Sequence, residues 1–252
     1  MTESAFFNWL LVSWLALAAA VFVLLFFVNA PYGRYLRAGW GPTLNNKAAW
    51  MVMESAAALL FALFFILGEA RGPVSWIFLL MWQAHYIHRA FIYPFSLRGP
   101  TRRMPVFVVA MGLTFNAVNT YLNGRYLFSL SGGYADSWLR DPRFILGLLL
   151  FAAGYVANRQ SDVVLGRLRQ SAQNGYKIPY GGLYRWVSCP NYLGEIAIWT
   201  GWALATWSLP GLAFAVWSVA NLAPRARANH AWYRQHFADY PRERKALLPR
   251  VW

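Results

Sequence analysis

The chain has 252 residues, of which 58% are hydrophobic and 18% aromatic, and its mean hydropathy is positive. Only 13% are charged, about half the share typical of soluble domains, so the composition excludes a soluble globular protein. The formal net charge of +14 is concentrated in short loops between apolar runs, which favours membrane topology and lipid headgroups over nucleic acid as its cause.

Seven apolar segments account for most of the chain. A helix needs about 20 apolar residues to cross the hydrocarbon core of a bilayer. In chain order, we predict spans at about 5–28, 48–67, 73–97, 104–123, 143–166, 191–208 and 210–224, the last with a helical continuation. The predicted fold is therefore an all-α polytopic membrane protein with seven transmembrane helices, forming a single membrane domain over residues 1–252.

The loops between these spans differ in charge. The loops after the first, third and fifth spans, together with the C-terminal tail, hold most of the basic residues, including Arg34, Arg37, Arg98, Arg102, Arg103, Arg167, Arg169, Lys177, Arg185 and the series from Arg225 to Arg250. Because basic loops stay on the cytoplasmic side, we predict an outside N-terminus and a cytoplasmic C-terminus. The protein would lie in the bacterial inner membrane, or in the endoplasmic reticulum of a eukaryote, with its active site open to the cytoplasm.

Glu54 is the most informative residue inside a span. It lies seven residues from Lys47, which places it roughly 10 Å below the membrane surface at 1.5 Å per residue. A carboxylate at that depth costs several kcal/mol unless it faces protein or a water-filled cavity. We therefore interpret Glu54 as part of a functional site.

The other intramembrane polar residues gather in the cytoplasmic halves of their spans. Most recur at helical spacing, which aligns them on one helix face: His85, Tyr86, His88 and Arg89; Asn116, Asn119 and Asn123; Asn158, Asp162 and Arg169; Asn191 and Glu195; Arg225, Asn229 and Tyr233. We expect one polar cavity that opens to the cytoplasm. The three asparagines of the fourth span are equally consistent with interhelical hydrogen bonding. His85 and His88 lack a convincing third ligand, so we expect no metal site.

A transporter or channel would also place carboxylates inside the membrane. Glu54, Asp162 and Glu195 would then form a proton or cation relay. Such a path needs polar residues up to the outer face. The first span and the outer halves of the second, fifth and sixth spans are almost entirely apolar, which disfavours transport.

Several long motifs follow one another along the chain. They are M-E at 53–54, H-Y-I-H-R-A-F-I-Y at 85–93, N-R-Q-S-D-V-V-L-G-R-L-R from Asn158, G-Y-K-I-P-Y-G-G-L-Y-R-W-V-S-C-P-N-Y-L-G-E at 175–195, A-L-A-T-W-S-L-P at 203–210 and F-A-D-Y-P-R-E-R-K-A-L-L-P at 237–249. Over about residues 45–250, the chain closely resembles the steroid 5α-reductase family. The resemblance implies a seven-span enzyme that reduces the C4–C5 double bond of 3-oxo-4-ene steroids with hydride from NADPH.

The resemblance also implies roles for individual residues. Glu54 and Tyr86 match the pair that contacts the 3-oxo oxygen, and we expect them to be catalytic. The cofactor-binding residues would be Asn158, Asp162, Arg169, Tyr176, Lys177, Asn191, Glu195, Arg225, Asn229 and Tyr233, with Arg103 added. The substrate pocket would include Trp50, Met53, Arg89, Phe115 and Asn116 besides the catalytic pair. Met53 stands where glutamine is common, Lys177 where arginine is common and Asn229 where histidine is common.

This chemistry suits the residue types. Hydride attack on the β-carbon of an enone moves negative charge to the carbonyl oxygen, which the Tyr86 hydroxyl can stabilise. Desolvated Glu54 either donates as a neutral acid or, when ionised, accepts from Tyr86 and orients it. No G-x-G-x-x-G motif follows a strand, so a Rossmann domain is absent and the dinucleotide must bind among helix ends and loops. The Gly181-Gly182 pair lets backbone approach a phosphate, although for the pair by itself a plain turn is the preferred interpretation.

The partners follow from the same reasoning. A hydrophobic steroid or enone lipid would enter from the bilayer between the first four spans (5–123), while NADPH would bind the last three and the cytoplasmic loops (143–250). We expect membrane lipids as neighbours, no nucleic acid and a monomer. Related membrane enzymes that reduce polyprenols or enoyl thioesters are the alternative, and a more distant relative methylates isoprenylcysteine. The Glu54–Tyr86 pair favours a ketone-type oxygen.

Overall fold

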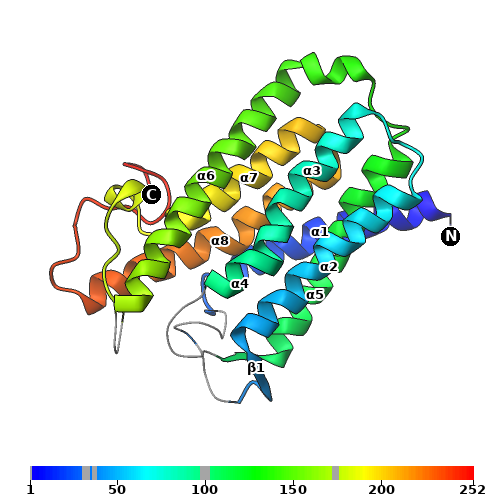
Figure 1. Ribbon diagram of the computed structural model, residues 1–252. Coiled ribbons are helices and arrows are strands. Elements are labelled where there is room, and N and C mark those ends of the chain that lie inside the picture. Colours follow the sequence, from blue (N-terminus) through cyan, green and yellow to red (C-terminus); the bar gives the residue numbers. More distant parts are fainter. Residues whose placement is uncertain (1, 30–34, 36–38, 97–102, 172–175) are drawn as a thin grey trace. The chain divides into compact units, whose positions relative to one another are not determined.

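The structure is a computed structural model that describes residues 2–29, 35, 39–96, 103–171 and 176–252 (Figure 1). The side chains of residues 169–171 are outside this description. So are four of the arginines used above to orient the spans: Arg34, Arg37, Arg98 and Arg102. The chain forms two compact units, and each is described by itself. Unit 1 comprises Met1–Leu11 and Ala30–Ile145, and unit 2 comprises Val12–Asn29 and Leu146–Trp252.

Unit 1 is built around helix α2. Its elements are β1 (Thr43–Asn45), α2 (Asn46–Leu67), α3 (Pro73–Ile87), the π-helix η2 (His88–Ile92), α4 (Tyr93–Ser96), β2 (Arg103–Pro105), α5 (Val106–Thr120), the π-helix η3 (Tyr121–Leu130) and the 3-10 helix η4 (Asp136–Arg140). Helix α2 begins where the Asn45 side chain accepts a hydrogen bond from the Lys47 amide at 2.8 Å. Helix α2 packs against α3 and α5 (Figure 1).

Two features of unit 1 were not foreseen. β1 and β2 form a short antiparallel ribbon, with Leu44 opposite Met104. The predicted fourth span ends at residue 123, whereas helical structure continues to Leu130. The sequence signal failed there because Asn123, Gly124 and Arg125 lower the hydropathy. The Arg125 guanidinium binds the Glu3 carboxylate through Nε at 2.6 Å and Nη2 at 2.9 Å, so its charge is paired.

Unit 2 contains α6 (Pro142–Ser171, whose first four residues belong to unit 1), the 3-10 helix η5 (Gly182–Arg185), α7 (Pro190–Thr206) and α8 (Leu209–His236). Helices α6, α7 and α8 lie side by side (Figure 1). Residues 12–24 of α1 (Glu3–Leu24) also belong here, and the Trp217 indole donates to the Trp14 carbonyl oxygen at 3.0 Å.

Four glycines bring α6 and α7 into backbone contact. Helix α6 carries Gly147 and Gly154, and α7 carries Gly194 and Gly201. The two glycines of each pair are seven residues apart, so they lie on the same face of their helix. A Cβ on Gly154 would lie 2.6 Å from the Ile198 amide nitrogen and 2.7 Å from the Gly194 carbonyl oxygen. Small residues at such spacing let membrane helices approach closely. The α6–α7 pair is therefore held by backbone contact that any side chain would prevent.

The C-terminal tail is anchored beside the start of α7. The Ser188 hydroxyl donates to the Lys245 carbonyl oxygen at 3.1 Å and lies 2.6 Å from both His230 Nδ1 and the Tyr240 hydroxyl. A bridge between Val187 and Lys245 adds backbone pairing. Burial raises the pKa of Tyr240, so this hydroxyl stays protonated at physiological pH.

The helical character predicted from the sequence is confirmed. Helices occupy all seven predicted positions, with ends within a few residues except at η3 and at the extended α8. Within the described residues, three helical stretches are long and apolar enough to cross a bilayer: Glu3–Leu24, Asn46–Leu67 and Val106–Leu130. The number of crossings and the orientation of the termini stay predictions.

Candidate active site

The α2–α3 contact sets the position of the two proposed catalytic residues in unit 1. The Trp82 indole donates to the Ala57 carbonyl oxygen at 3.1 Å, and its ring stacks on Phe61 with centroids 4.2 Å apart. The two helices run in opposite directions along this contact. Tyr86 lies one turn after Trp82 on α3, and Glu54 lies one turn before Ala57 on α2. Tyr86 is therefore at the level of Glu54.

Tyr86 and Glu54 differ in exposure. Tyr86 is 3% exposed, and its ring lies 4.9 Å from that of Trp82 and 5.1 Å from that of His85. Glu54 is half-buried. A buried phenol is suited to donate a hydrogen bond to a carbonyl oxygen in a water-poor site.

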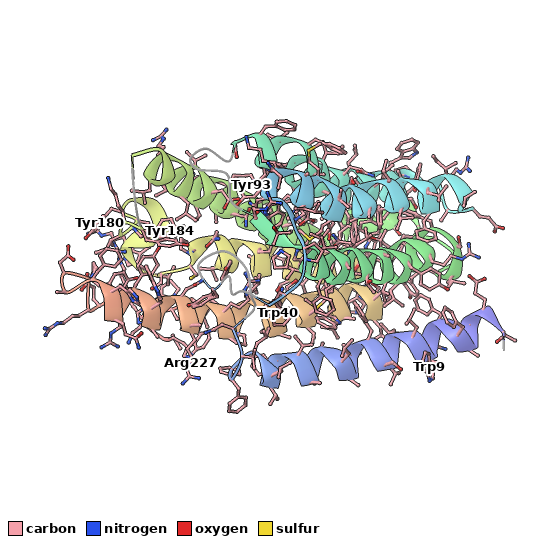
Figure 2. All side chains as sticks on the ribbon, turned by 90° about the horizontal axis from the view of Figure 1, so that it is seen from below. Trp9, Trp40, Tyr93, Tyr180, Tyr184 and Arg227 are labelled. Atoms are coloured by element: carbon pink, nitrogen blue, oxygen red, sulfur yellow. The ribbon has the colours of Figure 1, made fainter. Side chains whose placement is uncertain are left out.

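Arg89 lies one turn of helix beyond Tyr86, in the π-helix η2. Its guanidinium carbon is 4.6 Å from the Trp50 ring and 4.7 Å from the Tyr93 ring, and these rings are 5.6 Å apart at 82°. Single π turns are frequent at functional sites. Sequence reasoning selected Trp50 and Arg89 but missed Tyr93, which Figure 2 labels. The signal was available, because Tyr93 ends the motif at 85–93.

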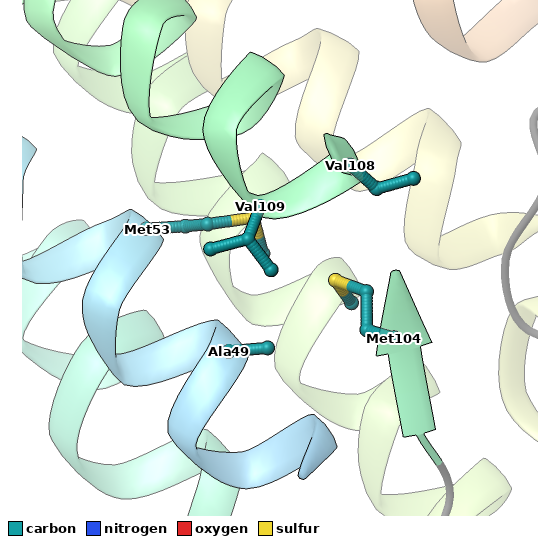
Figure 3. Close-up of a cluster of buried hydrophobic side chains, with 5 residues drawn as sticks. All are labelled: Ala49, Met53, Met104, Val108 and Val109. Carbon is teal, nitrogen blue, oxygen red and sulfur yellow. The ribbon is translucent and has the colours of Figure 1, made fainter. Parts of the chain in front are cut away.

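Helix α5 fixes the turn of α2 that carries Glu54. The buried Asn116 side chain donates to the Met53 carbonyl oxygen at 2.7 Å. Met53 belongs to a buried apolar cluster with Ala49, Met104, Val108 and Val109, and points toward Val109 (Figure 3). Asn116 and Met53, both predicted to contact substrate, thus also join α2 to α5. The remaining predicted pocket residue, Phe115, is half-buried on α5.

In unit 2, the close approach of α6 and α7 assembles three of the predicted cofactor-binding residues. Asn158 Nδ2 donates to the Asn191 carbonyl oxygen at 2.9 Å and to Glu195 Oε2 at 3.0 Å. The Trp199 indole donates to Glu195 Oε1 at 3.1 Å. Arg159 Nη2 donates to Asn158 Oδ1 at 2.7 Å. The Glu195 carboxylate is therefore held at both oxygens.

Trp199 and Arg159 were missed by the sequence reasoning. Trp199 follows Glu195 by four residues, which is the spacing of neighbours on a helix surface, so a signal existed. Its ring is 2% exposed and stacks on Phe214 with centroids 3.8 Å apart. For Arg159, adjacent to Asn158 in sequence, nothing in the spacing indicated the contact.

Tyr192 joins the α8 residues of the predicted set. Its hydroxyl accepts hydrogen bonds from Arg225 Nη2 at 3.3 Å and from Asn229 Nδ2 at 3.4 Å. The Arg225 guanidinium also lies 5.4 Å from the Tyr192 ring centroid. Tyr192 was missed, although it stands within the motif at 175–195.

The other predicted cofactor residues are placed as follows. Tyr176 packs against Trp232 at 5.1 Å, and buried Tyr233 stacks on Tyr240 at 5.3 Å. Lys177 is exposed, and Asp162 is half-buried one turn from Asn158 on α6. Arg103 lies in unit 1, where it donates to Thr43 Oγ1 at 2.6 Å and to the Thr43 carbonyl oxygen at 2.8 Å. The Arg169 side chain lies outside the described residues.

Comparison with known proteins identifies the family. The sequence pattern of the 3-oxo-5-alpha-steroid 4-dehydrogenase family matches residues 102–252. The chain is 40% identical to the steroid 5-alpha-reductase DET2 of Gossypium hirsutum over 256 aligned residues, covering 100% of this chain and 99% of the relative. It is 42% identical to 3-oxo-5-alpha-steroid 4-dehydrogenase 1 of Bos taurus, covering 93% and 92% respectively, and 40% identical to its namesake in Homo sapiens, covering 93% and 91%.

The match and the geometry agree. The matched region holds α5 to α8 with the Asn158–Glu195 and Tyr192 clusters, and the relatives extend the similarity through α2 and α3. The apolar helices are those of a membrane protein. This chain belongs to the steroid 5-alpha-reductase family and is an oxidoreductase of the 3-oxo-5-alpha-steroid 4-dehydrogenase type.

Proposed function

We propose that this enzyme uses NADPH to reduce the C4–C5 double bond of 3-oxo-4-ene steroids, or of similar enone lipids. The observation that carries the proposal is the α2–α3 register, in which Trp82 binds the Ala57 carbonyl oxygen and Tyr86 follows one turn later. That register supports Tyr86 and Glu54 as a pair facing the substrate's 3-oxo group.

Tyr86 stabilises the charge that develops during the reaction. The cofactor, when bound, supplies a hydride to the β-carbon of the enone. The electron pair of the double bond then moves toward the carbonyl, and the 3-oxo oxygen becomes an enolate. The buried Tyr86 hydroxyl donates a hydrogen bond to that oxygen, in a site from which its apolar neighbours exclude water. The α-carbon afterwards takes a proton, from Tyr86 or from solvent.

Glu54 supports Tyr86 in one of two ways. As a neutral acid it donates a second hydrogen bond to the enolate oxygen; as a carboxylate it accepts from the Tyr86 hydroxyl and orients it. Trp50, Met53, Arg89, Phe115 and Asn116 would line the surrounding substrate pocket. Each lies on α2, which carries Glu54, or on η2 or α5, which pack against α2.

The residues of unit 2 have the chemistry needed to hold NADPH. Ribose hydroxyls and a carboxamide require paired acceptors and donors, which the fixed Glu195 carboxylate and the Asn158 amide supply. Arg225 and Lys177 can neutralise phosphate. The full proposed set is Asn158, Asp162, Arg169, Tyr176, Lys177, Asn191, Glu195, Arg225, Asn229 and Tyr233, together with Arg103.

The membrane arrangement completes the proposal. We infer seven transmembrane helices in one domain, an outside N-terminus, a cytoplasmic C-terminus and a monomer, with lipid-soluble substrate arriving from the bilayer and NADPH from the cytoplasm. Basic residues in alternate loops support this orientation. The alternative within the same fold is reduction of a polyprenol or an enoyl thioester.

Loss of NADPH absorbance with different substrates tests the proposal. Progesterone or testosterone should be reduced and an enoyl-CoA should not. Removing one oxyanion donor typically lowers kcat by about 10²–10³-fold. The kcat of the Tyr86→Phe and Glu54→Gln variants should therefore fall by that factor, while the dissociation constant for NADPH stays within about twofold. Tyr126→Phe is the matched control, because that ring packs against Phe7 at 6.1 Å elsewhere in unit 1. Full steroid turnover by Tyr86→Phe would refute the assignment.

A further inference from the structure

Unit 2 contains a cavity that the proposed function does not use. Its volume is about 640 Å³, and segments 180–186 and 241–244 form most of its wall. Gln160 lines it from α6. A residue two positions away on a helix points to the opposite side, so Gln160 faces away from Asn158 and Asp162. Of the proposed cofactor-binding residues whose side chains the structure describes, none lines this cavity.

Arg244 gives the cavity an uncompensated positive charge. The residue is 3% exposed, and its Nη1 donates to the Pro179 carbonyl oxygen at 2.9 Å. Its guanidinium carbon lies 4.8 Å from the Tyr180 ring and 5.3 Å from the Tyr240 ring. Within the described residues, its buried Nε has no hydrogen-bond partner and no carboxylate forms an ion pair with it. Burying a cation without a counter-charge is unfavourable, so a bound anion would stabilise this arrangement.

The remaining wall favours an anion at a membrane surface. Arg185 is exposed and adds a second guanidinium, while Glu243 is the one carboxylate among the described residues that line the cavity. Guanidinium groups match the oxygens of a phosphate in pairs. Tyr180 is 57% exposed and Trp186 is 47% exposed. Such amphipathic rings are enriched at the membrane–water interface. Tyr180 and Tyr184 lie together at one end of the unit (Figure 2).

We propose that this cavity binds the phosphate of an anionic lipid headgroup. The phosphate lies between Arg185 and Arg244 and provides the counter-charge for Arg244, which forms no ion pair among the described residues, while Tyr180 and Trp186 cover the glycerol and the first acyl carbons. Gly181 and Gly182 have φ +93° and +51°, and a Cβ on either would meet no atom within 4 Å. The mouth of the cavity is therefore free of side chains there.

Lipid titration of the purified full chain in neutral detergent tests the proposal. The dissociation constant for phosphatidylglycerol, measured by native mass spectrometry, should be lower than that for phosphatidylcholine. Arg185→Gln should raise it about 10-fold, the effect of losing one charge-assisted contact. Arg242→Gln is the matched control: Arg242 is exposed, close in the chain to Arg244 and absent from the cavity wall, so the change should stay within about twofold.

A second variant has the opposite expected effect. Glu243→Gln removes the acid that lines the cavity and should tighten phosphatidylglycerol binding about threefold. This variant is used in place of an Arg244 substitution, because replacing Arg244 also breaks its hydrogen bond to the Pro179 carbonyl oxygen and can prevent folding. Equal weakening by Arg185→Gln and Arg242→Gln would overturn the proposal. So would equally effective displacement of lipid by inorganic phosphate, or displacement by NADPH, which would assign the cavity to free phosphate or to the cofactor.

Discussion

Gly154→Ala tests whether backbone contact between α6 and α7 builds the proposed cofactor site. The new Cβ would lie 2.6 Å from the Ile198 amide nitrogen, whereas ordinary contact begins at 3.4 Å. The two nearest obstructing atoms are helix backbone, so the helices must separate by roughly 0.8 Å, the difference between those distances. The same shift would take the Asn158–Glu195 hydrogen bond from 3.0 Å to about 3.8 Å, beyond bonding range.

Two measurements check this expectation. Overpacking of this kind typically costs about 1–3 kcal/mol, which for a chain of this size lowers Tm by roughly 2–12 °C. The dissociation constant for NADPH should rise about 10-fold, because a hydrogen bond to a charged group contributes roughly 1.5–3 kcal/mol. Thermal unfolding in detergent and fluorescence titration with NADPH provide both values.

Gly166→Ala is the control for this substitution. Gly166 is on the same helix, but a Cβ there meets nothing within 4 Å. Alanine should therefore raise stability by about 0.5–1 kcal/mol through its helix propensity and leave NADPH binding unchanged. If Gly154→Ala matched Gly166→Ala in both Tm and NADPH affinity, the reasoning about helix approach would be wrong.

Three further substitutions are informative. Trp199→Phe keeps an aromatic ring but loses the hydrogen-bond donor to Glu195 Oε1, so the NADPH dissociation constant should rise about fivefold with kcat unchanged. Unaltered NADPH affinity would contradict the idea that Trp199 positions Glu195. Asn116→Ala removes the bond to the Met53 carbonyl oxygen and should lower the free energy of unfolding by about 1–3 kcal/mol, seen as a lower Tm; an unchanged Tm would count against that contact. Burial, with nearby basic side chains, lowers the pKa of His230 below 6.5. Below pH 6.5 the unfolded chain therefore takes up a proton that the folded chain does not, and Tm should fall as the pH drops from 7 to 5. His230→Gln should make Tm less dependent on pH over this range.

The linear sequence predicted the helices well. Hydropathy places a helix by local composition, so α2, α7 and the helical stretch from α3 through α4 begin and end within about two residues of their predicted limits. The signal failed at η3, where Arg125 ends the apolar run but is neutralised by Glu3, a residue 122 positions away. Hydropathy also did not predict the π-helical geometry of η2 and η3, because composition does not specify the spacing of backbone hydrogen bonds.

The candidate site divides in the same way. Glu54, Asn158 and Glu195 could be selected from sequence because a polar group inside an apolar helix needs a reason to be there. The glycine contacts of α6 and α7 could not, since glycines are common in membrane helices whatever they touch. Trp199 and Tyr192 were missed although their positions in the sequence carried a signal. Only the tertiary structure decides which helices meet and at what distance. That distance turns an asparagine and a glutamate, 37 positions apart, into one hydrogen-bonded group.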